Sequence, residues 1–332
     1  MNNTIVLSHP ACLEHRPGPH HPESPERLKA VLTALRSPEF ASLEWLEAPL
    51  GTIEQVQLIH DAAFIDEIAG MAPSHGYVPL DGGDTVMSPG SWEAVMRCVG
   101  AACAGVDAVM NGKARNAFCA TRPCGHHAEP SRAMGFCIFN QAAIAAAYAL
   151  ETFQLERVAV VDFDVHHGNG TQAAFFNRPE LFYASSHQSP LYPGTGAASE
   201  TGVDHNIVNV PLPRGCDSAL FRAHIESGML PAVRDFDPQL IIISAGFDAH
   251  RLDPLAGLNL EDSDFHWITT ELVRIADAAC EGRIVSILEG GYSLEALATG
   301  TTVHVRALMN TASDLAFNSS RRFRLPTSPS GS

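Results

Sequence analysis

Several features that mark common protein classes are missing from this sequence. It contains no run of basic residues, and 21 Lys and Arg against 37 Asp and Glu give a formal net charge of −16. A protein with this charge cannot take its main binding energy from the release of phosphate counterions, which argues against a nucleic-acid partner. The excess of acidic groups favours a cationic ligand instead.

Long hydrophobic runs are also missing. Apolar stretches such as Ala142–Leu150 and Leu240–Ile243 are far shorter than the roughly 20 residues that cross a bilayer. The N-terminal sequence MNNTIVLSHP has no basic segment, so we expect neither a secretory signal nor a membrane partner. The eight cysteines include no C-x-x-C pair, and we expect them to be reduced core residues of a cytoplasmic protein.

Two common catalytic signatures are absent as well. The Gly-rich segment Tyr192–Gly196 (YPGTG) lacks the Lys-Ser/Thr that ends a phosphate-binding loop. No G-x-S-x-G motif occurs, which argues against a serine hydrolase. What the sequence does have is 16 histidines. Among them, His9, His20 and His21 lie in a Pro-rich N-terminal segment and are expected at the mouth of a cleft.

Short apolar runs that alternate with helical patterns indicate the fold class. Most of these runs are continuously apolar, as expected for strands that are buried on both faces of a parallel sheet. The alternation predicts an α/β fold, a single domain with a mainly parallel sheet flanked by helices. We expect this domain to span residues 1–317 and a weakly structured tail to span 318–332. The predicted strands are Thr4–Ser8, Ala117–Thr121, Val158–Phe163, Leu181–Ser185, Ile207–Val210, Leu240–Ser244 and Ile284–Leu288.

Helices are predicted between these strands. Ser24 and Ser88 each precede a proline, an arrangement typical of a helix that begins with Pro at its first position. The predicted helices are Pro25–Leu35, Pro89–Met110, Gln141–Leu150, Ser218–Arg234, Ser263–Glu281 and Leu294–Met309.

Four of the predicted strands end in polar, Gly-rich loops. These loops are Arg122–His127, Asp162–Gly170, Ser244–Ala249 and Glu289–Tyr292. Ligands of parallel sheets bind beyond the carboxyl ends of the strands, so these loops are expected to meet at one site.

A set of carboxylates and one imidazole in these loops has the composition of a metal site. Asp162, Asp164 and His166 are spaced i, i+2, i+4, so all three point to one side if the strand continues through them. With Asp248 as a third ligand, Asp164 and His166 would leave a tetrahedral position of a zinc ion open for water. The alternative is that the aspartates cap the following turn and His166 lies at the surface.

Two adjacent histidines and one tyrosine could supply acid–base chemistry. His126 and His127 titrate near neutral pH and could move a proton from water to a leaving amine. Asp162 and Asn169 are candidates to orient their rings. Tyr292 follows two glycines and could donate a hydrogen bond to a developing oxyanion. An exposed His pair, a second metal site and a packed core tyrosine are the alternatives.

Taken together, these motifs resemble a known enzyme family. In order along Arg122–Tyr292 the chain reads RPCGHHA, VDFDVHHGNGTQ, YPGTG, SAGFDAHRLDPL and EGGY, and HPESPERL precedes them at His21–Leu28. This pattern is similar to the zinc-dependent histone deacetylase superfamily, which includes acetylpolyamine amidohydrolases and has the arginase/deacetylase fold. The forms HHGNGTQ and SAGFD look more like the class II branch.

The resemblance implies a role for each matching residue. It implies one Zn²⁺ ion held by Asp164, His166 and Asp248. It implies a general acid/base pair of His126 and His127, backed by Asp162 and Asn169, and hydrogen bonding of Tyr292 to the substrate carbonyl. It further implies substrate contacts from Gly135, Phe136, Tyr192, Leu255 and Asp84, and a structural K⁺ ion held by Ser185 and Ser186 with Asp162, Asp164 and His166.

The expected activity is therefore removal of acetyl or longer acyl groups from acyl-lysine side chains of proteins or peptides. The alternative within the same chemistry is an acetylpolyamine deacetylase that acts on small N-acetylated amines. Two further alternatives are an arginase-like manganese enzyme and a catalytically silent acetyl-lysine binding module. We expect a bacterial cytoplasmic setting, and a homo-oligomer stays open.

Overall fold

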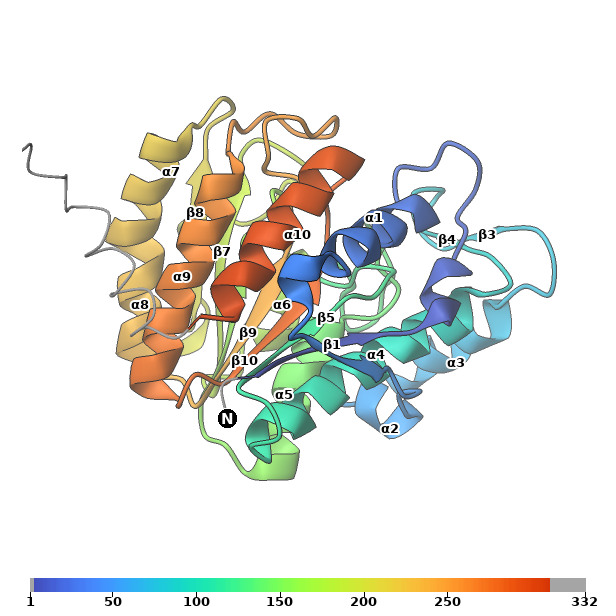
Figure 1. Cartoon of the computed structure of the whole chain (residues 1–332). Coiled ribbons are helices and arrows are strands. Elements are labelled where there is room, and N and C mark those ends of the chain that lie inside the picture. The colour runs from blue at the N-terminus through green and yellow to red at the C-terminus, as the bar shows by residue number, and fades with distance from the viewer. Residues whose placement is uncertain (1–2, 311–332) are drawn as a thin grey trace, which may run out of the picture.

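An eight-stranded parallel sheet forms the centre of the computed structural model, which describes residues 3–310 (Figure 1). The expected tail 318–332 and the last residues of the expected domain lie outside this range. The strand order is β2-β1-β5-β10-β9-β6-β7-β8. All the registered neighbours in this sheet run parallel. The strands are β1 Thr4–Ser8, β2 Glu44–Glu47, β5 Asn116–Cys119, β6 Val158–Asp162, β7 Leu181–Gln188, β8 Ile207–Leu212, β9 Leu240–Ala245 and β10 Ile284–Leu288.

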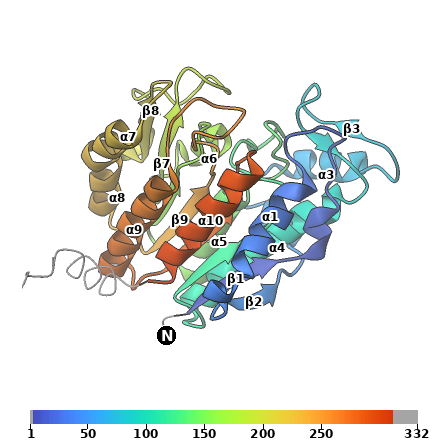
Figure 2. The same cartoon turned by 45° about the horizontal axis from the view of Figure 1, so that its top comes forward.

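Helices cover both faces of this sheet. In Figures 1 and 2, α1, α9 and α10 lie side by side on one face, with α7 and α8 beside α9. The other face is covered by α4 and α5, whose alanine-rich surfaces allow close approach to the strands. These helices are α1 Pro25–Leu35, α4 Ser91–Met110, α5 Gln141–Phe153, α7 Ser218–His224, α8 Leu230–Phe236, α9 Asp262–Ala279 and α10 Leu294–Leu308.

Smaller elements extend the molecule beyond one edge of the sheet. A cluster of buried apolar side chains joins α2 and α3 to α4. These elements are α2 Ile53–Val56, α3 Ala62–Met71 and the antiparallel pair β3 Val78–Pro79 and β4 Val86–Met87. Within residues 3–310 no helix is long and apolar enough to span a membrane. All eight cysteines of the chain are buried and free.

The structure confirms the predicted fold class and corrects two helices. The helix predicted from Pro89 begins at Ser91, with Gly90 rather than Ser88 as its N-cap. The stretch Ser218–Arg234 is interrupted by a π-helical turn at Ile225–Met229, after which α8 begins. Pro231 in the first turn of α8 has no N–H to donate, so the regular hydrogen-bond ladder cannot run through this point. The structure also adds the short helix α6, Asn169–Phe175, and the elements β2, α2, α3, β3 and β4, none of which the sequence pattern predicted.

Candidate active site

The four polar loops follow four strands that are neighbours in the sheet. β5, β10, β9 and β6 are adjacent and parallel, so their carboxyl ends lie at one edge. Their loops carry the histidine pair, Tyr292, Asp248, and the pair Asp164 and His166 respectively. The strand order therefore brings together in space segments that are far apart in the sequence.

Three side chains at this edge form a compact set of metal-ligand atoms. Nδ1 of His166 lies 3.1 Å from Oδ1 of Asp164 and 3.2 Å from Oδ2 of Asp248. Ligand atoms in a tetrahedral zinc shell of radius about 2 Å lie roughly 3.3 Å apart. Oδ2 of Asp248 is buried and accepts no hydrogen bond of normal geometry from the described residues, a costly state unless a cation compensates it. The donor set therefore fits a divalent metal ion.

These side chains reach the site through a turn rather than a strand. Strand β6 ends at Asp162, so the expected extended geometry through His166 is wrong. The N–H of Asp164 donates to Oδ1 of Asp162 at 3.1 Å, and the N–H of His166 donates to Oδ1 of Asp164 at 2.9 Å. Each aspartate thus stabilises the turn two residues on and still points its second oxygen elsewhere. The turn-capping part of the alternative is therefore correct, but His166 does not lie at the surface, because its side chain is only 12% exposed.

The charges within this set shift one another's pKa values. Burial raises the pKa of Asp248, and the neighbouring carboxylate of Asp164 raises it further, to about 7. Burial would lower the pKa of His166, but its contacts with Asp164 and Asp248 outweigh that effect and raise it to about 10. Two buried carboxylates so close together favour a cation between them.

Two glycines leave space for these carboxylates. A Cβ on Gly290 would lie 2.1 Å from Oδ2 of Asp248, and a Cβ on Gly246 would lie 2.1 Å from Oδ2 of Asp164. The N–H of Gly290 also donates to Oδ2 of Asp164 at 2.8 Å. Any larger residue at either position would displace a carboxylate from the cluster.

His126 is held by a carboxylate. Its Nδ1 lies 2.9 Å from Oδ2 of Asp162, which also accepts the hydroxyl hydrogen of Tyr183 at 2.9 Å. Burial would lower the pKa of His126, but the carboxylates of Asp164 and Asp162 outweigh it and raise that pKa well above its usual value. His126 can therefore hold a proton at neutral pH.

His127 lies beside His126 but has the opposite character. The two rings are 4.0 Å apart, and Nδ1 of His127 lies 2.9 Å from Oδ1 of Asn169. Burial lowers the pKa of His127, and the neighbouring rings of His126 and His166 lower it further. His127 is therefore neutral and can accept a proton.

The backbone around Tyr292 is anchored from both sides. Its N–H donates to Oδ2 of Asp253 at 2.7 Å, and Nε of Arg27 donates to the carbonyl of Gly291 at 2.6 Å. The Arg27 guanidinium also lies 4.9 Å from the centre of the Tyr292 ring. Burial raises the pKa of Tyr292 well above its usual value, so its hydroxyl keeps the hydrogen that it would donate.

All five residues expected to contact substrate line one pocket of about 220 Å³ with His127, His166 and Tyr292. The ring centre of Phe136 lies 5.9 Å from that of Tyr292, and the ring centre of Tyr192 lies 5.1 Å from that of His127. The other lining residues are Asp84, Gly135 and Leu255.

Gly135 lets the wall of this pocket approach His127 closely. It has φ +58, and a Cβ there would lie 2.5 Å from Cδ2 of His127. The N–H of Gly135 donates to Oδ2 of Asp81 at 3.2 Å, and Oδ2 of Asp81 also accepts from the hydroxyl of Thr85 at 2.7 Å. The loop that carries Asp84 is thereby tied to the pocket wall.

Ser185 and Ser186 lie on β7 and do not line the pocket. Both are buried, and Ser185 is the registered partner of Asp162 on the neighbouring strand. The hydroxyl of Ser185 lies 2.9 Å from Nδ1 of His187.

Comparison with known proteins shows the family. The chain matches the histone deacetylase domain over residues 21–308. It is 41% identical over 301 residues to the uncharacterized protein slr0245 of a Synechocystis species, covering 90% of this chain and 96% of that protein. It is 37% identical over 306 residues to a histone deacetylase-like amidohydrolase of Pseudomonas aeruginosa, covering 85% of this chain and 80% of that protein.

This chain belongs to the histone deacetylase family. Its fold matches the crystal structure of the HDA15 HD domain with a TM-score of 0.88 and 32% identity, covering 93% of this chain and 89% of that one. Membership in this family of deacetylases and amidohydrolases supports a hydrolase, and the family is metal-dependent.

Several buried charged residues bind one another beneath the loops of the site. They were not among the predicted site residues. Arg122 donates to Glu23 from Nε at 2.7 Å, and Nε2 of His15 lies 3.2 Å from the same carboxylate. Arg27 lies 3.2 Å from Glu23 and links it to the Tyr292 loop. The signal was in the sequence, because charged residues inside HPESPERL and RPCGHH need partners if the segments are buried.

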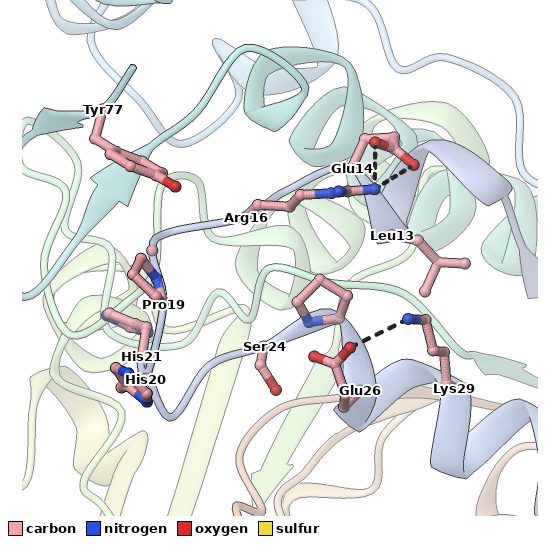
Figure 3. A pocket seen from close by; sticks show the side chains of 12 residues that line it. Leu13, Glu14, Arg16, Pro19, His20, His21, Ser24, Glu26, Lys29 and Tyr77 are labelled. Carbon is pink, nitrogen blue, oxygen red and sulfur yellow. Dashed lines mark hydrogen bonds and ion pairs between the residues drawn. The ribbon is translucent and has the colours of Figure 1, made fainter. Parts of the chain in front are cut away.

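A second, wider groove of about 530 Å³ adjoins the pocket of this deacetylase-family chain (Figure 3). His21 separates the two, because it lines the groove, lies 3.1 Å from the carbonyl oxygen of Asp84 and packs its ring 4.7 Å from that of Phe136. His20 lines the groove as expected, whereas His9 instead accepts from the N–H of Ala11 and pairs with Glu47. Figure 3 shows acidic and basic groups paired along the groove, Glu14 with Arg16 and Glu26 with Lys29.

Proposed function

We propose that this protein is a zinc-dependent amidohydrolase that removes acetyl or longer acyl groups from lysine side chains of proteins or peptides. One observation carries the proposal. A single pocket with aromatic walls ends at a neutral histidine, a protonated tyrosine hydroxyl and a carboxylate–imidazole metal set. These are the groups that hydrolysis of an unactivated amide requires.

Asp164, His166 and Asp248 would hold the metal ion. Zinc bound there would polarise the acyl carbonyl and lower the pKa of the attacking water. We prefer one ion to the paired manganese ions of an arginase. A second manganese ion would need further aspartate ligands. Within residues 3–310, the other group of potential ligands is Cys124, Cys137 and Glu289, which contains no aspartate.

The protein side chains would then divide the proton transfers. Neutral His127 takes a proton from the attacking water, while His126, held by Asp162, carries positive charge next to it. Tyr292 donates its hydroxyl hydrogen to the oxygen of the tetrahedral intermediate. A protonated imidazole then delivers a proton to the leaving lysine amine. The intact Tyr292 and histidine pair argue against a silent binding module.

The surroundings of the pocket favour a peptide over a polyamine. Asp84 at the rim could accept a hydrogen bond from a substrate backbone N–H, and the adjoining groove offers room for residues beside the acyl-lysine. A polyamine site would be favoured by a uniformly acidic entrance, but Glu14 and Glu26 in the groove are paired with Arg16 and Lys29.

A structural potassium ion is part of the proposal by family resemblance. Ser185 and Asp162 stand opposite each other on β7 and β6, which supports an oxygen-rich position next to Asp164 and His166.

A parallel assay tests the substrate class. We would compare kcat/KM for acetyl-lysine peptides, longer acyl-lysine peptides, acetylputrescine and acetylspermidine, since this ratio measures discrimination directly. Higher values for the peptides support the proposal, and higher values for the polyamines replace it with the alternative. Metal analysis after mild purification identifies the ion.

A further inference from the structure

The side chain of Asn169 lies between His127 and a carboxylate that has no role in the mechanism above. Oδ1 of Asn169 is 2.9 Å from Nδ1 of His127. On its other side, Nδ2 donates to Oε1 of Glu129 at 2.7 Å and more weakly to the carbonyl of His127 at 3.4 Å. Asn169 and His127 are buried and Glu129 is half-buried, so water competes little for these bonds.

The chemistry of these groups leaves one arrangement of hydrogens. A carboxylate can only accept, so the NH₂ end of the Asn169 amide must face Glu129 and its oxygen must face His127. Because that oxygen also only accepts, the hydrogen of the neutral His127 ring lies on Nδ1. The other ring nitrogen, Nε2, then carries a lone pair and is the one that can take a proton.

We propose that Glu129 is a positioning residue that fixes the ring tautomer of His127 through the amide of Asn169. The inference rests on the function proposed above, since the tautomer matters only if His127 accepts a proton. A negatively charged acceptor strengthens the bond to the amide and so makes the opposite amide orientation costly. Glu129 is itself fixed by a backbone turn, in which its N–H donates to the carbonyl of Arg132 at 2.9 Å.

The two histidines are both oriented by hydrogen bonds, but only His126 is in direct contact with a negative charge. His126 is oriented by Asp162 in direct contact, and the same carboxylate places negative charge against its ring. The amide of Asn169 is oriented by Glu129 and in turn orients the ring of His127. Because the amide lies between them, the negative charge of Glu129 does not contact His127. Adjacent histidines can thus be held in fixed orientations while only one of them carries a second ring proton and a positive charge.

Substitution of Glu129 tests the first part of the proposal. Glu129→Leu removes the acceptor and should lower kcat about tenfold to a hundredfold, as outer partners of catalytic groups typically do, while KM changes less than about twofold. Glu129→Gln keeps a neutral acceptor, so its kcat should lie between that of Glu129→Leu and that of the unchanged protein. Glu151→Gln on the exposed end of α5 is the matched control and should leave kcat unchanged.

A second substitution makes the test independent of folding defects. Asn169→Asp places a carboxylate against Glu129, so the two repel and kcat should fall. In that background Glu129→Gln supplies an NH₂ donor to the introduced carboxylate and should raise kcat, although the same change lowers it in the unchanged protein. A merely structural role of Glu129 predicts no such reversal of sign. If the double variant is no faster than Asn169→Asp, the proposal is overturned.

The tautomer itself can be observed without turnover. Two-bond ¹⁵N–¹H correlation spectra of ¹⁵N-histidine-labelled protein, before and after metal removal, show which ring nitrogen of His127 carries the hydrogen. We expect the hydrogen on Nδ1 in the unchanged protein and a mixed population in Glu129→Leu. A hydrogen on Nε2, or identical spectra for both proteins, would refute the inference. Failure of the unchanged protein to hydrolyse acyl-lysine would instead refute the proposed function.

Discussion

At the scale of single residues, neighbours rather than residue type decide what each group of the site can do. His126 and His127 are adjacent in sequence and both buried, yet the pKa of one is raised and that of the other is lowered. The difference follows from what touches each ring, because a carboxylate from Asp162 faces His126 and an amide from Asn169 faces His127. An acid and a base can therefore lie side by side at one site.

Removal of single proposed catalytic groups should lower turnover strongly without loss of metal. Tyr292→Phe removes the donor to the oxyanion and should lower kcat for an acetyl-lysine peptide by about 100-fold to 1,000-fold. His127→Ala should lower it by orders of magnitude as well. Zinc content, measured by elemental analysis, should stay the same in both variants. Near-normal turnover in either variant would contradict the assigned roles.

The space beside the metal ligands makes a second residue-scale prediction. Gly290→Ala would bring a Cβ within 2.1 Å of Oδ2 of Asp248, so that carboxylate must move. We expect the variant to fold but to bind zinc at least about tenfold more weakly, measured by competition with a chelator. Gly70→Ala is the matched control, because a Cβ at Gly70 meets nothing within 4 Å. Equal zinc affinity of the two variants would show that Gly290 does not shape the site.

At the scale of elements, buried polar contacts hold the helices on the sheet. His304 of α10 lies between α9 and β10, with Nδ1 2.7 Å from the hydroxyl of Thr269 and Nε2 2.8 Å from that of Ser286. Burial lowers the pKa of His304 to about 3. Both ring nitrogens are thus engaged by neutral hydroxyls, and a protonated ring is strongly disfavoured in the folded state.

This histidine should make stability depend on pH in a known direction. Between pH 3 and about 6.5 the unfolded chain binds a proton at His304 that the folded protein does not, so the free energy of unfolding falls as the pH falls. His304→Gln should remove about 1 kcal/mol per pH unit of this dependence between about pH 6 and 5. Denaturant unfolding at several pH values measures both slopes. Coincident slopes would contradict the assignment.

An element was predictable from the sequence when a few neighbouring residues were enough to define it. The bounds of β1, β10 and α1 were predicted correctly, because a buried apolar run or a Ser-Pro start defines them within a few residues. The edge strand β2 (EWLE) was missed because it is largely exposed and lacks an apolar run. The helix α6 was missed because its first residues, Asn169 and Gly170, are typical of loops.

At the scale of the whole molecule, the N-terminal segment is locked onto the sheet by buried charges. Glu23 accepts from Arg122, which precedes the histidine pair, and lies 3.2 Å from Arg27, which holds the Tyr292 loop. Burial would raise the pKa of Glu23, but Arg122 outweighs it and holds that pKa well below its usual range. The network therefore links the N-terminal segment to two loops of the candidate site, across 99 residues from Glu23 to Arg122 and across 264 residues from Arg27 to Gly291.

Loss of this central carboxylate should destabilise the entire fold. Glu23→Gln leaves two buried guanidinium groups without their counterion and should cost about 3–5 kcal/mol of unfolding free energy. Glu39→Gln, which breaks an exposed ion pair with Arg306, is the matched control and should cost less than about 1 kcal/mol. Similar losses in the two variants, measured by denaturant unfolding, would show that the buried network does not stabilise the fold.

The members of the candidate site were predictable from sequence, but their mutual arrangement was not. Motif residues after strand ends identified Asp164, His166 and Asp248, because parallel strands deliver their following loops to one edge. Long-range contacts such as Arg27 with Gly291, or Asn169 with Glu129, depend on strand order and on where each loop turns. No local pattern encodes those contacts, which is why the roles of Arg27 and Glu129 emerged only from the structure.

The most direct test of the central claim is acetate release from an acetyl-lysine peptide while zinc is titrated into the metal-free protein. The account predicts that the rate rises with added zinc and levels off at one ion per chain. It also predicts that Asp248→Asn removes this rise, because Oδ2 of Asp248 is a buried oxygen that accepts no hydrogen bond of normal geometry from residues 3–310. No acetate release at any zinc concentration, or release that needs a second zinc ion, would contradict the account.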